Sequence, residues 1–249
     1  MSRRVRILVL GPALAGLGTL FGWAIAGLPA FGEYRGPYGF VLNRLVVPLR
    51  HTTNVVMGTT FDVRGVDTMG EEFILYAAVV GVTLLLRDET RSRQAERRTR
   101  RLPNDAVRLV GVGMIGGGLL VGLWLMAFGY ITPGGGFQGG VLFAGAILLL
   151  YVVGSHRDYR PFRDERALDP LEGLGAGGYV MIGLAALVSG TAFLTNLFGL
   201  GMAGTLLSGG SIPLLNWASA IAVSCAMVLL FAEFLETYVV PLEPEDAGL

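Results

Sequence analysis

Four carboxylates lie close together in the stretch DVRGVDTMGEEF, directly before a long apolar segment: Asp62, Asp67, Glu71 and Glu72. Carboxylates bind cations and exchange protons, and an ionisable group at membrane depth indicates a functional site. The structural alternative is a helix start, with Thr68 as N-cap and Glu71 three residues later in the spacing of a capping box. Both glutamates would also suit the positive end of the helix dipole. The residues leave both interpretations open for Glu71 and Glu72, and favour the structural one for Asp62 and Asp67.

A second stretch, TPGGGFQGG from Thr132 to Gly140, has no charged residue near it. The proline prevents a helix from continuing, and the glycines allow backbone conformations with positive φ. It is either a hairpin turn between two membrane helices or irregular backbone that lines a water-filled cavity. In the second case Gln138 offers a neutral ligand to a cation and Phe137 gates it. The candidate residues of this stretch are Pro133, Gly134, Gly135, Gly136, Phe137 and Gln138.

Motifs of soluble enzymes are not supported. The run GVGMIGGG has the formal spacing of a dinucleotide-binding loop, but it follows an arginine-rich segment and leads into an uncharged one instead of following a strand. The triple glycine lacks the Gly-Lys-Ser/Thr of a phosphate loop. His51 and His156 lack metal-ligand spacing, and the single Cys225 excludes a disulfide within the chain. We therefore expect no catalytic residues, no cofactor, no firm metal site and no nucleic-acid partner.

The composition predicts an integral membrane protein. Charged residues make up 15% of the 249 residues, against about 25% in a typical soluble domain. Three uncharged runs each exceed the ~20 residues that cross a bilayer as a helix. We expect an all-α fold with about six transmembrane helices, near Ile7–Leu28, Gly70–Leu86, Leu109–Tyr130, Phe137–Gly154, Leu174–Leu197 and Ile212–Leu235.

The arginines predict the orientation. With the N-terminus inside, three arginines precede the first span, eight lie from Arg87 to Arg108, and four lie from Arg157 to Arg166. Cytoplasmic segments carry such an excess, so both termini should be cytoplasmic. The expected organisation is a two-helix module with a long outer loop (1–87), an arginine-rich cytoplasmic linker (88–106), a four-helix domain (107–238) and an acidic tail (239–249).

The second half of the chain resembles a known family. TPGGGFQGGVLFAGAILLLY resembles the signature of the MnhB/MrpB family, one of the component proteins of the Mrp-type (Mnh) multisubunit Na⁺/H⁺ antiporters. That signature has a proline, three glycines, Phe-Gln and a helix of small residues. The four spans from Leu109 to Leu235 fit the family's four-helix domain.

The first half is similar to a different module. DVRGVDTMGEE resembles a D-[FY]-R-G-F-D-T-x-G-E run near the C-terminal end of the large A subunit, also found in E-type subunits of Mrp-related membrane-bound hydrogenases. Val63 and Val66 stand where the family usually has an aromatic ring. Besides the acidic residues, the matching positions that we take as a structural motif are Asn54, Arg64, Thr68 and Gly70.

The resemblance implies a non-enzymatic subunit of a monovalent cation (Na⁺)/proton antiporter in the cytoplasmic membrane of a prokaryote. Its implied partners are the large A and D subunits, the small C, E, F and G subunits, Na⁺, H⁺ and the lipid bilayer. Transient Na⁺ contact is implied near Asp62, Asp67, Glu71 and Gln138. Two alternatives stay open: a purely structural scaffold subunit, and the equivalent subunit of a membrane-bound hydrogenase or another redox complex related to complex I.

Overall fold

The computed structural model describes residues 3–28, 30–33, 36–86, 105–153 and 159–239. The chain divides into two compact units, residues 1–41 and 42–249, which we treat separately. The predicted arginine-rich linker lies almost wholly outside the described residues, as does nearly all of the acidic tail. In the first unit, helix α1 (Arg3–Ala26) contains the shorter apolar stretch Gly11–Ala26.

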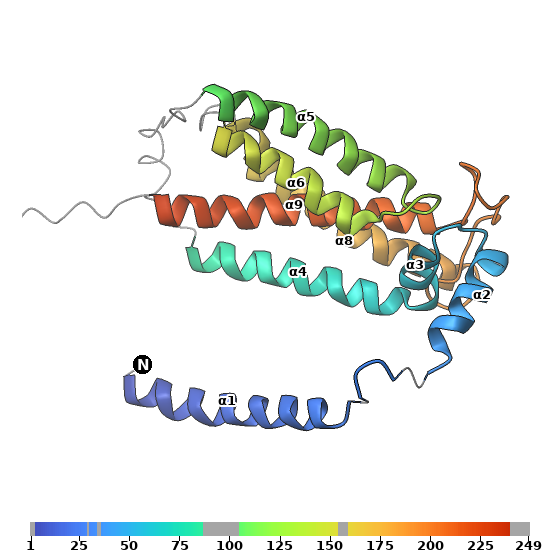
Figure 1. Ribbon diagram of the computed structural model, residues 1–249, viewed down its shortest axis with the longest axis horizontal. Helices are drawn as coiled ribbons and strands as arrows, with labels where there is room; N and C mark the ends of the chain where they lie inside the picture. Colours follow the sequence, from blue (N-terminus) through green and yellow to red (C-terminus); the bar gives the residue numbers. More distant parts are fainter. Residues whose placement is uncertain (1–2, 29, 34–35, 87–104, 154–158, 240–249) are drawn as a thin grey trace, which may run out of the picture. The chain divides into compact units, whose positions relative to one another are not determined.

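The second unit is entirely helical apart from its turns and one isolated bridge in the part that the structure describes (Figure 1). Helix α2 (Tyr38–Arg50) begins in the last residues of the first unit, and most of it belongs to the second unit. The further elements are α3 (Val55–Gly58), the π-helix η1 (Thr59–Val63), α4 (Gly65–Leu86), α5 (Asp105–Phe128), α6 (Gly136–Val153), the 3-10 helix η4 (Arg160–Arg163), α8 (Glu165–Val188) and α9 (Ile212–Val239).

Five helices are long and apolar enough to cross a membrane: α4, α5, α6, α8 and α9. With the shorter apolar stretch in α1, they account for the six predicted segments as helices. The all-α multi-pass class is therefore confirmed by helix length and composition.

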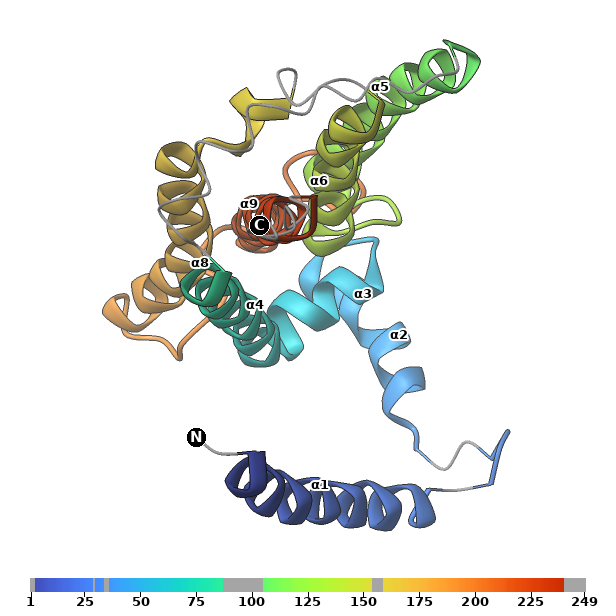
Figure 2. The same ribbon diagram turned by 90° about the vertical axis from the view of Figure 1, so that its left-hand side faces the viewer.

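Helix α9 forms the core of the second unit. It packs against α4, α6 and α8, and Figure 2 shows these three helices around it. In the apolar part of α9 that is long enough to cross a membrane, 61% of the residues are buried. The corresponding share is 33% in both α6 and α8. Small side chains allow this close approach, because Ala218, Ala220, Ala222 and Ala226 are all buried in α9. Helix α5 packs on α6, where a Cβ at Gly122 would lie 3.0 Å from the Phe143 backbone nitrogen.

Two predicted spans have wrong boundaries. The fifth, expected at Leu174–Leu197, is α8 at Glu165–Val188. The prediction placed the span in the uncharged stretch after Glu172. The helix instead includes Glu172, which is buried by packing, and ends before Gly190, whose φ is 80°. Asp164 starts the helix by accepting a hydrogen bond from the Arg166 amide at 3.2 Å. The second span, expected from Gly70, begins at Gly65.

The segment that we expected to be one long outer loop holds α2, α3 and η1. The predicted capping box is also wrong. Thr68 lies inside α4 and not at its N-cap, and its hydroxyl donates to the Thr60 carbonyl at 2.7 Å. The helix begins earlier because the π-helix leads directly into it.

Candidate functional site

The acidic motif lies on a broken helix. Asn54 caps α3, its side-chain oxygen accepting hydrogen bonds from the Val56 and Met57 amides at 3.0 and 3.3 Å. The π-helix then closes with the Arg64 amide donating to the Thr59 carbonyl at 2.7 Å, five residues back. π-Helical turns inside α-helices occur frequently at functional sites. The break sets Asp62 on the π-helix, apart from the three acids on α4.

Asn54 also joins the acidic motif to the glycine turn. Its side-chain nitrogen donates to the carbonyls of Gly129, Thr132 and Gly134 at 2.6, 3.1 and 3.3 Å. The neighbouring Thr52 hydroxyl donates to the Tyr130 carbonyl. The connection between α2 and α3 thus holds the turn between α5 and α6, although about 75 residues separate them in the sequence. The sequence assigned the two segments to different modules.

The triple glycine is a junction of three helices. Gly134 has a φ of 154°, and a Cβ there would lie 2.8 Å from the Leu125 side chain on α5. A Cβ at Gly135 would lie 3.3 Å from the Met57 sulfur on α3. A Cβ at Gly136 would overlap the Asn216 carbonyl on α9. The predicted hairpin turn is confirmed, since it occupies residues 129–135 between α5 and α6.

The two motifs line one cavity of about 190 Å³. Glu71 and Gln138 are exposed residues that line it, and they bring a carboxylate and an amide to it. Thr60 and Thr68 add hydroxyl groups, and the glycine turn adds backbone. Oxygen ligands of this kind suit a hard monovalent cation, whose hydration shell they can replace. The cavity is lined by Val56, Met57, Thr60, Phe61, Thr68, Glu71, Gly134, Gly135, Gly136, Phe137 and Gln138.

Glu72 points to the opposite side, into the helix core. It is 2% exposed, and the Ser219 hydroxyl of α9 donates to its Oε1. Its Oε2 has no hydrogen-bond partner in the described part of the chain. The Tyr179 hydroxyl of α8 lies near it and donates to the Gly65 carbonyl at 2.9 Å. Glu71 and Glu72 therefore occupy different environments, one in the cavity and one in the core.

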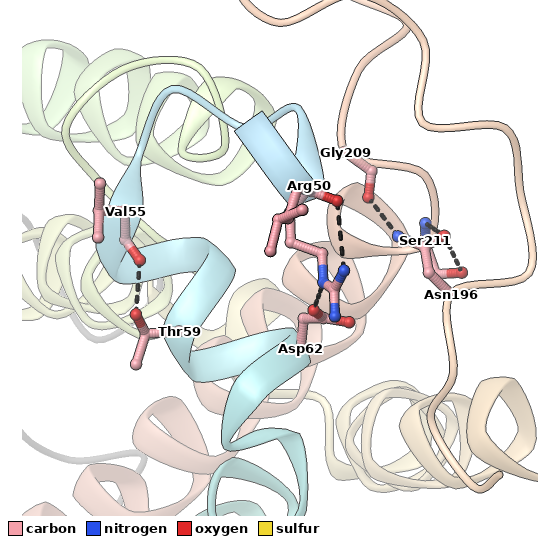
Figure 3. Close-up of polar contacts among 8 residues, drawn as sticks. Arg50, Val55, Thr59, Asp62, Asn196, Gly209 and Ser211 are labelled. Carbon is pink, nitrogen blue, oxygen red and sulfur yellow. Dashed lines mark hydrogen bonds and ion pairs between the residues drawn. The ribbon is translucent and has the colours of Figure 1, made fainter. Parts of the chain in front are cut away.

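Asp62 and Asp67 each pair with an arginine. Arg50 binds Asp62 with side chains 39% and 10% exposed, and Arg64 binds Asp67 at 2.5 Å (Figure 3 draws the first pair). Asp62 and Arg50 line a second cavity of about 410 Å³, together with the α8–α9 loop. Because each carboxylate already has a positive partner, neither offers a free negative charge.

The loop between α8 and α9 lines the cavity beside Asp62, which the sequence did not predict. The Asn196 amide donates to the Gly209 carbonyl at 2.9 Å, and its oxygen accepts from the Ser211 amide at 2.8 Å (Figure 3). Asn196 lines the cavity beside Asp62. No group of three or more metal-binding side chains occurs in the described residues.

Several polar side chains in the helix core were missed: Glu172, Tyr179, Asn216 and Ser219. Asn216 is fully buried, and its side-chain nitrogen donates to the Met126 carbonyl of α5. The available signal was a polar pair three residues apart in an otherwise apolar run, which puts Asn216 and Ser219 on one face of a membrane helix.

Comparison with known proteins identifies the region that carries the glycine turn. Residues 114–229 match the family "Domain related to MnhB subunit of Na+/H+ antiporter". This chain contains an MnhB domain. The MnhB domain covers α6, α8 and most of α5 and α9, and it includes the whole TPGGGFQGG stretch. The resemblance of this half of the chain is confirmed.

A curated relative of the MnhB-domain chain is the "Uncharacterized protein MJ1307" of Methanocaldococcus jannaschii. It is 32% identical over 157 residues, which cover 57% of this chain and 60% of the relative. The chain thus spans about three fifths of the length of that relative.

Two solved structures share the fold. One belongs to "the membrane-bound sulfane sulfur reductase (MBS), an archaeal respiratory membrane complex". It has a TM-score of 0.64 and 27% identity and covers 92% of this chain and 97% of that one. The other belongs to the "Mrp complex from Dietzia sp. DQ12-45-1b". It has a TM-score of 0.63 and 20% identity. The match covers 98% of this chain but only 27% of the other chain. The MnhB-domain chain therefore resembles chains of two kinds of membrane complex.

Proposed function

We propose that this chain is a subunit of a multisubunit Na⁺/H⁺ antiporter of the Mrp type and that it contributes to the path of the ions. The observation that carries the proposal is the shared cavity. Glu71 from the first motif and Gln138 from the second line the same 190 Å³ space. A single carboxylate with neutral oxygen ligands binds a monovalent cation weakly enough to release it, as transport requires.

The proposed setting is the cytoplasmic membrane of a prokaryote. Both termini lie on the cytoplasmic side, because fifteen of the nineteen arginines then lie inside. In this orientation the glycine turn and the cavity open toward the outside. The proposed partners are the A and D subunits and the small C, E, F and G subunits.

The test uses the complete complex in everted membrane vesicles. Glu71→Gln removes the negative charge but keeps the shape of the side chain, and Gln138→Ala removes the amide. We expect both variants to assemble and to lose most Na⁺-dependent proton exchange. Asp105→Asn is the matched control, since it neutralises an exposed carboxylate in the first turn of α5. Normal assembly with unchanged exchange in both cavity variants would leave only a scaffold role.

A second candidate function is the equivalent subunit of a membrane-bound respiratory complex. The nearly full mutual coverage with the sulfane sulfur reductase chain favours it. In that case the redox chemistry resides in other subunits. Purification of the tagged chain separates the two settings, since large antiporter subunits alone indicate the first and co-purifying redox subunits the second.

A further inference from the structure

A second carboxyl group is buried in the helix core, well away from the cavity of Glu71 and Gln138. Glu172 lies two turns into α8 and is 4% exposed. Its Oε1 has no hydrogen-bond partner among the residues that the structure describes. An ionised carboxylate left unpaired in an apolar interior is very costly, so such a group holds a proton or exchanges one. At membrane depth an ionisable side chain indicates a function by default.

The surroundings of Glu172 come from three helices. The Cys225 thiol of α9 is close enough to interact with it electrostatically, and Asp169 on its own helix does so as well. From α4, the side chains at this level are apolar: Leu75 and Val79 pack in one cluster with Leu168, one turn before Glu172. No described arginine is paired with it. The site therefore has negative or neutral neighbours, which favour a bound proton.

Glu172 is aligned with Glu72 along the interface of α4, α8 and α9. Tyr179, beside Glu72, follows Glu172 by seven residues on the same face of α8, a rise of about 10 Å. On α9, Cys225 follows Ser219, which binds Glu72, by six residues, a rise of about 9 Å. The two helices give the same spacing independently. Along the helix axes the two buried carboxyls are thus offset by about 10 Å, across part of the membrane thickness.

We propose that Glu172 is a proton-binding site, the second of a pair with Glu72 inside the interface of α4, α8 and α9. Glu172 takes up a proton at Oε1 to become a neutral acid and releases it to return to the carboxylate. The spacing is too long for direct transfer between the two carboxyls. The Tyr179 hydroxyl beside Glu72 and water entering the interface are the carriers between them. Glu72, near the start of α4, lies toward the glycine turn. Glu172, near the start of α8, lies farther from that turn.

The first experiment needs no transport assay. Dicyclohexylcarbodiimide adds to protonated carboxyl groups in apolar surroundings, and mass spectrometry locates the adduct. With the native complex in membranes, we expect Glu172 to be modified and its modification to fall as pH rises. Exposed carboxyls such as Asp105 remain unmodified. A Glu172 that stays unmodified at every pH while reagent reaches other buried carboxyls would overturn the proposal.

The second experiment measures proton exchange and therefore rests on the proposed antiporter function. We expect Glu172→Gln to assemble and to lose most exchange, and Glu172→Asp to restore part of it with a shifted pH profile. Exchange by Glu172→Gln at the wild-type rate and pH profile would contradict a proton-binding role. The two proposals fail separately: unchanged exchange in Glu71→Gln removes the cavity but leaves the carbodiimide result for Glu172 standing.

Discussion

The side-chain nitrogen of Asn54 donates to the Gly129 carbonyl at 2.6 Å, and this contact fixes the first motif on the second. The same nitrogen reaches the Thr132 and Gly134 carbonyls, and the side-chain oxygen caps α3. One amide therefore satisfies backbone groups of two segments. Glu71 and the glycine turn line the same cavity, so this contact joins two segments that border it.

Replacing Asn54 should weaken both ends of the contact. Asn54→Ala removes the cap and leaves turn carbonyls without their donor, so we expect a loss of about 2–3 kcal/mol in stability. Asn54→Ser keeps an N-cap oxygen but is too short to hold the turn, and should lose about half as much. Thermal unfolding of the purified complex at fixed subunit concentration measures both. An Asn54→Ser variant as stable as the wild type would show that the turn gains nothing from the amide.

A methyl group at Gly136 should disrupt the junction of α6 with α9. The added Cβ would overlap the Asn216 carbonyl and lie 2.9 Å from the Ala220 amide, and neither backbone group can move aside. We expect Gly136→Ala to lower stability by about 1–3 kcal/mol through overpacking. Gly145→Ala is the control on the same helix, where a Cβ has no described atom within 4 Å. A similar melting temperature for the two variants would contradict the tight junction.

The sequence predicted both motifs and the hairpin turn but not that they meet. Local signals such as Pro133 and the glycines report where a helix stops, whereas the hydrogen bonds of Asn54 join positions about 75 residues apart. A single sequence carries no information on such pairing. The sequence indicates Asn54 only as a match to the resembling module.

The errors have two physical causes. Charged residues usually lie at the ends of spans, yet α8 continues through Glu172 because the core of the bundle buries it. The π-helix at Thr59–Val63 contains neither glycine nor proline, so no helix-breaking residue within it indicates the change of helix type. Its effect was to move the start of α4 to Gly65 and to place Thr68 inside the helix, which removed the predicted cap.

The hydroxyl of Ser219 should matter to the buried Glu72. Ser219→Ala leaves both carboxyl oxygens of Glu72 without a described donor, and an unsatisfied buried group costs about 1–3 kcal/mol. Ser224→Ala is the control on the same helix, because that hydroxyl donates at 2.6 Å only to the Ala220 carbonyl of its own helix. Thermal unfolding of the complex compares them. If both serines are dispensable, Glu72 does not depend on α9 for its hydrogen bond.

The ion pair of Arg50 and Asp62 should show as an energetic coupling. Arg50→Gln leaves the largely buried Asp62 carboxylate without its cation, whereas the double variant Arg50→Gln/Asp62→Asn removes both charges. Because Arg50 is partly exposed, we expect a coupling of about 0.5–1 kcal/mol, so that the double variant is more stable than the sum of the single changes predicts. Thermal unfolding of the wild-type, single and double variants in one buffer measures it.

The control pair is Arg64→Gln with Asp67→Asn, in which both side chains are more than half exposed and screened by solvent. Strictly additive effects for Arg50 and Asp62 would contradict an ion pair that fixes α2 to the π-helix.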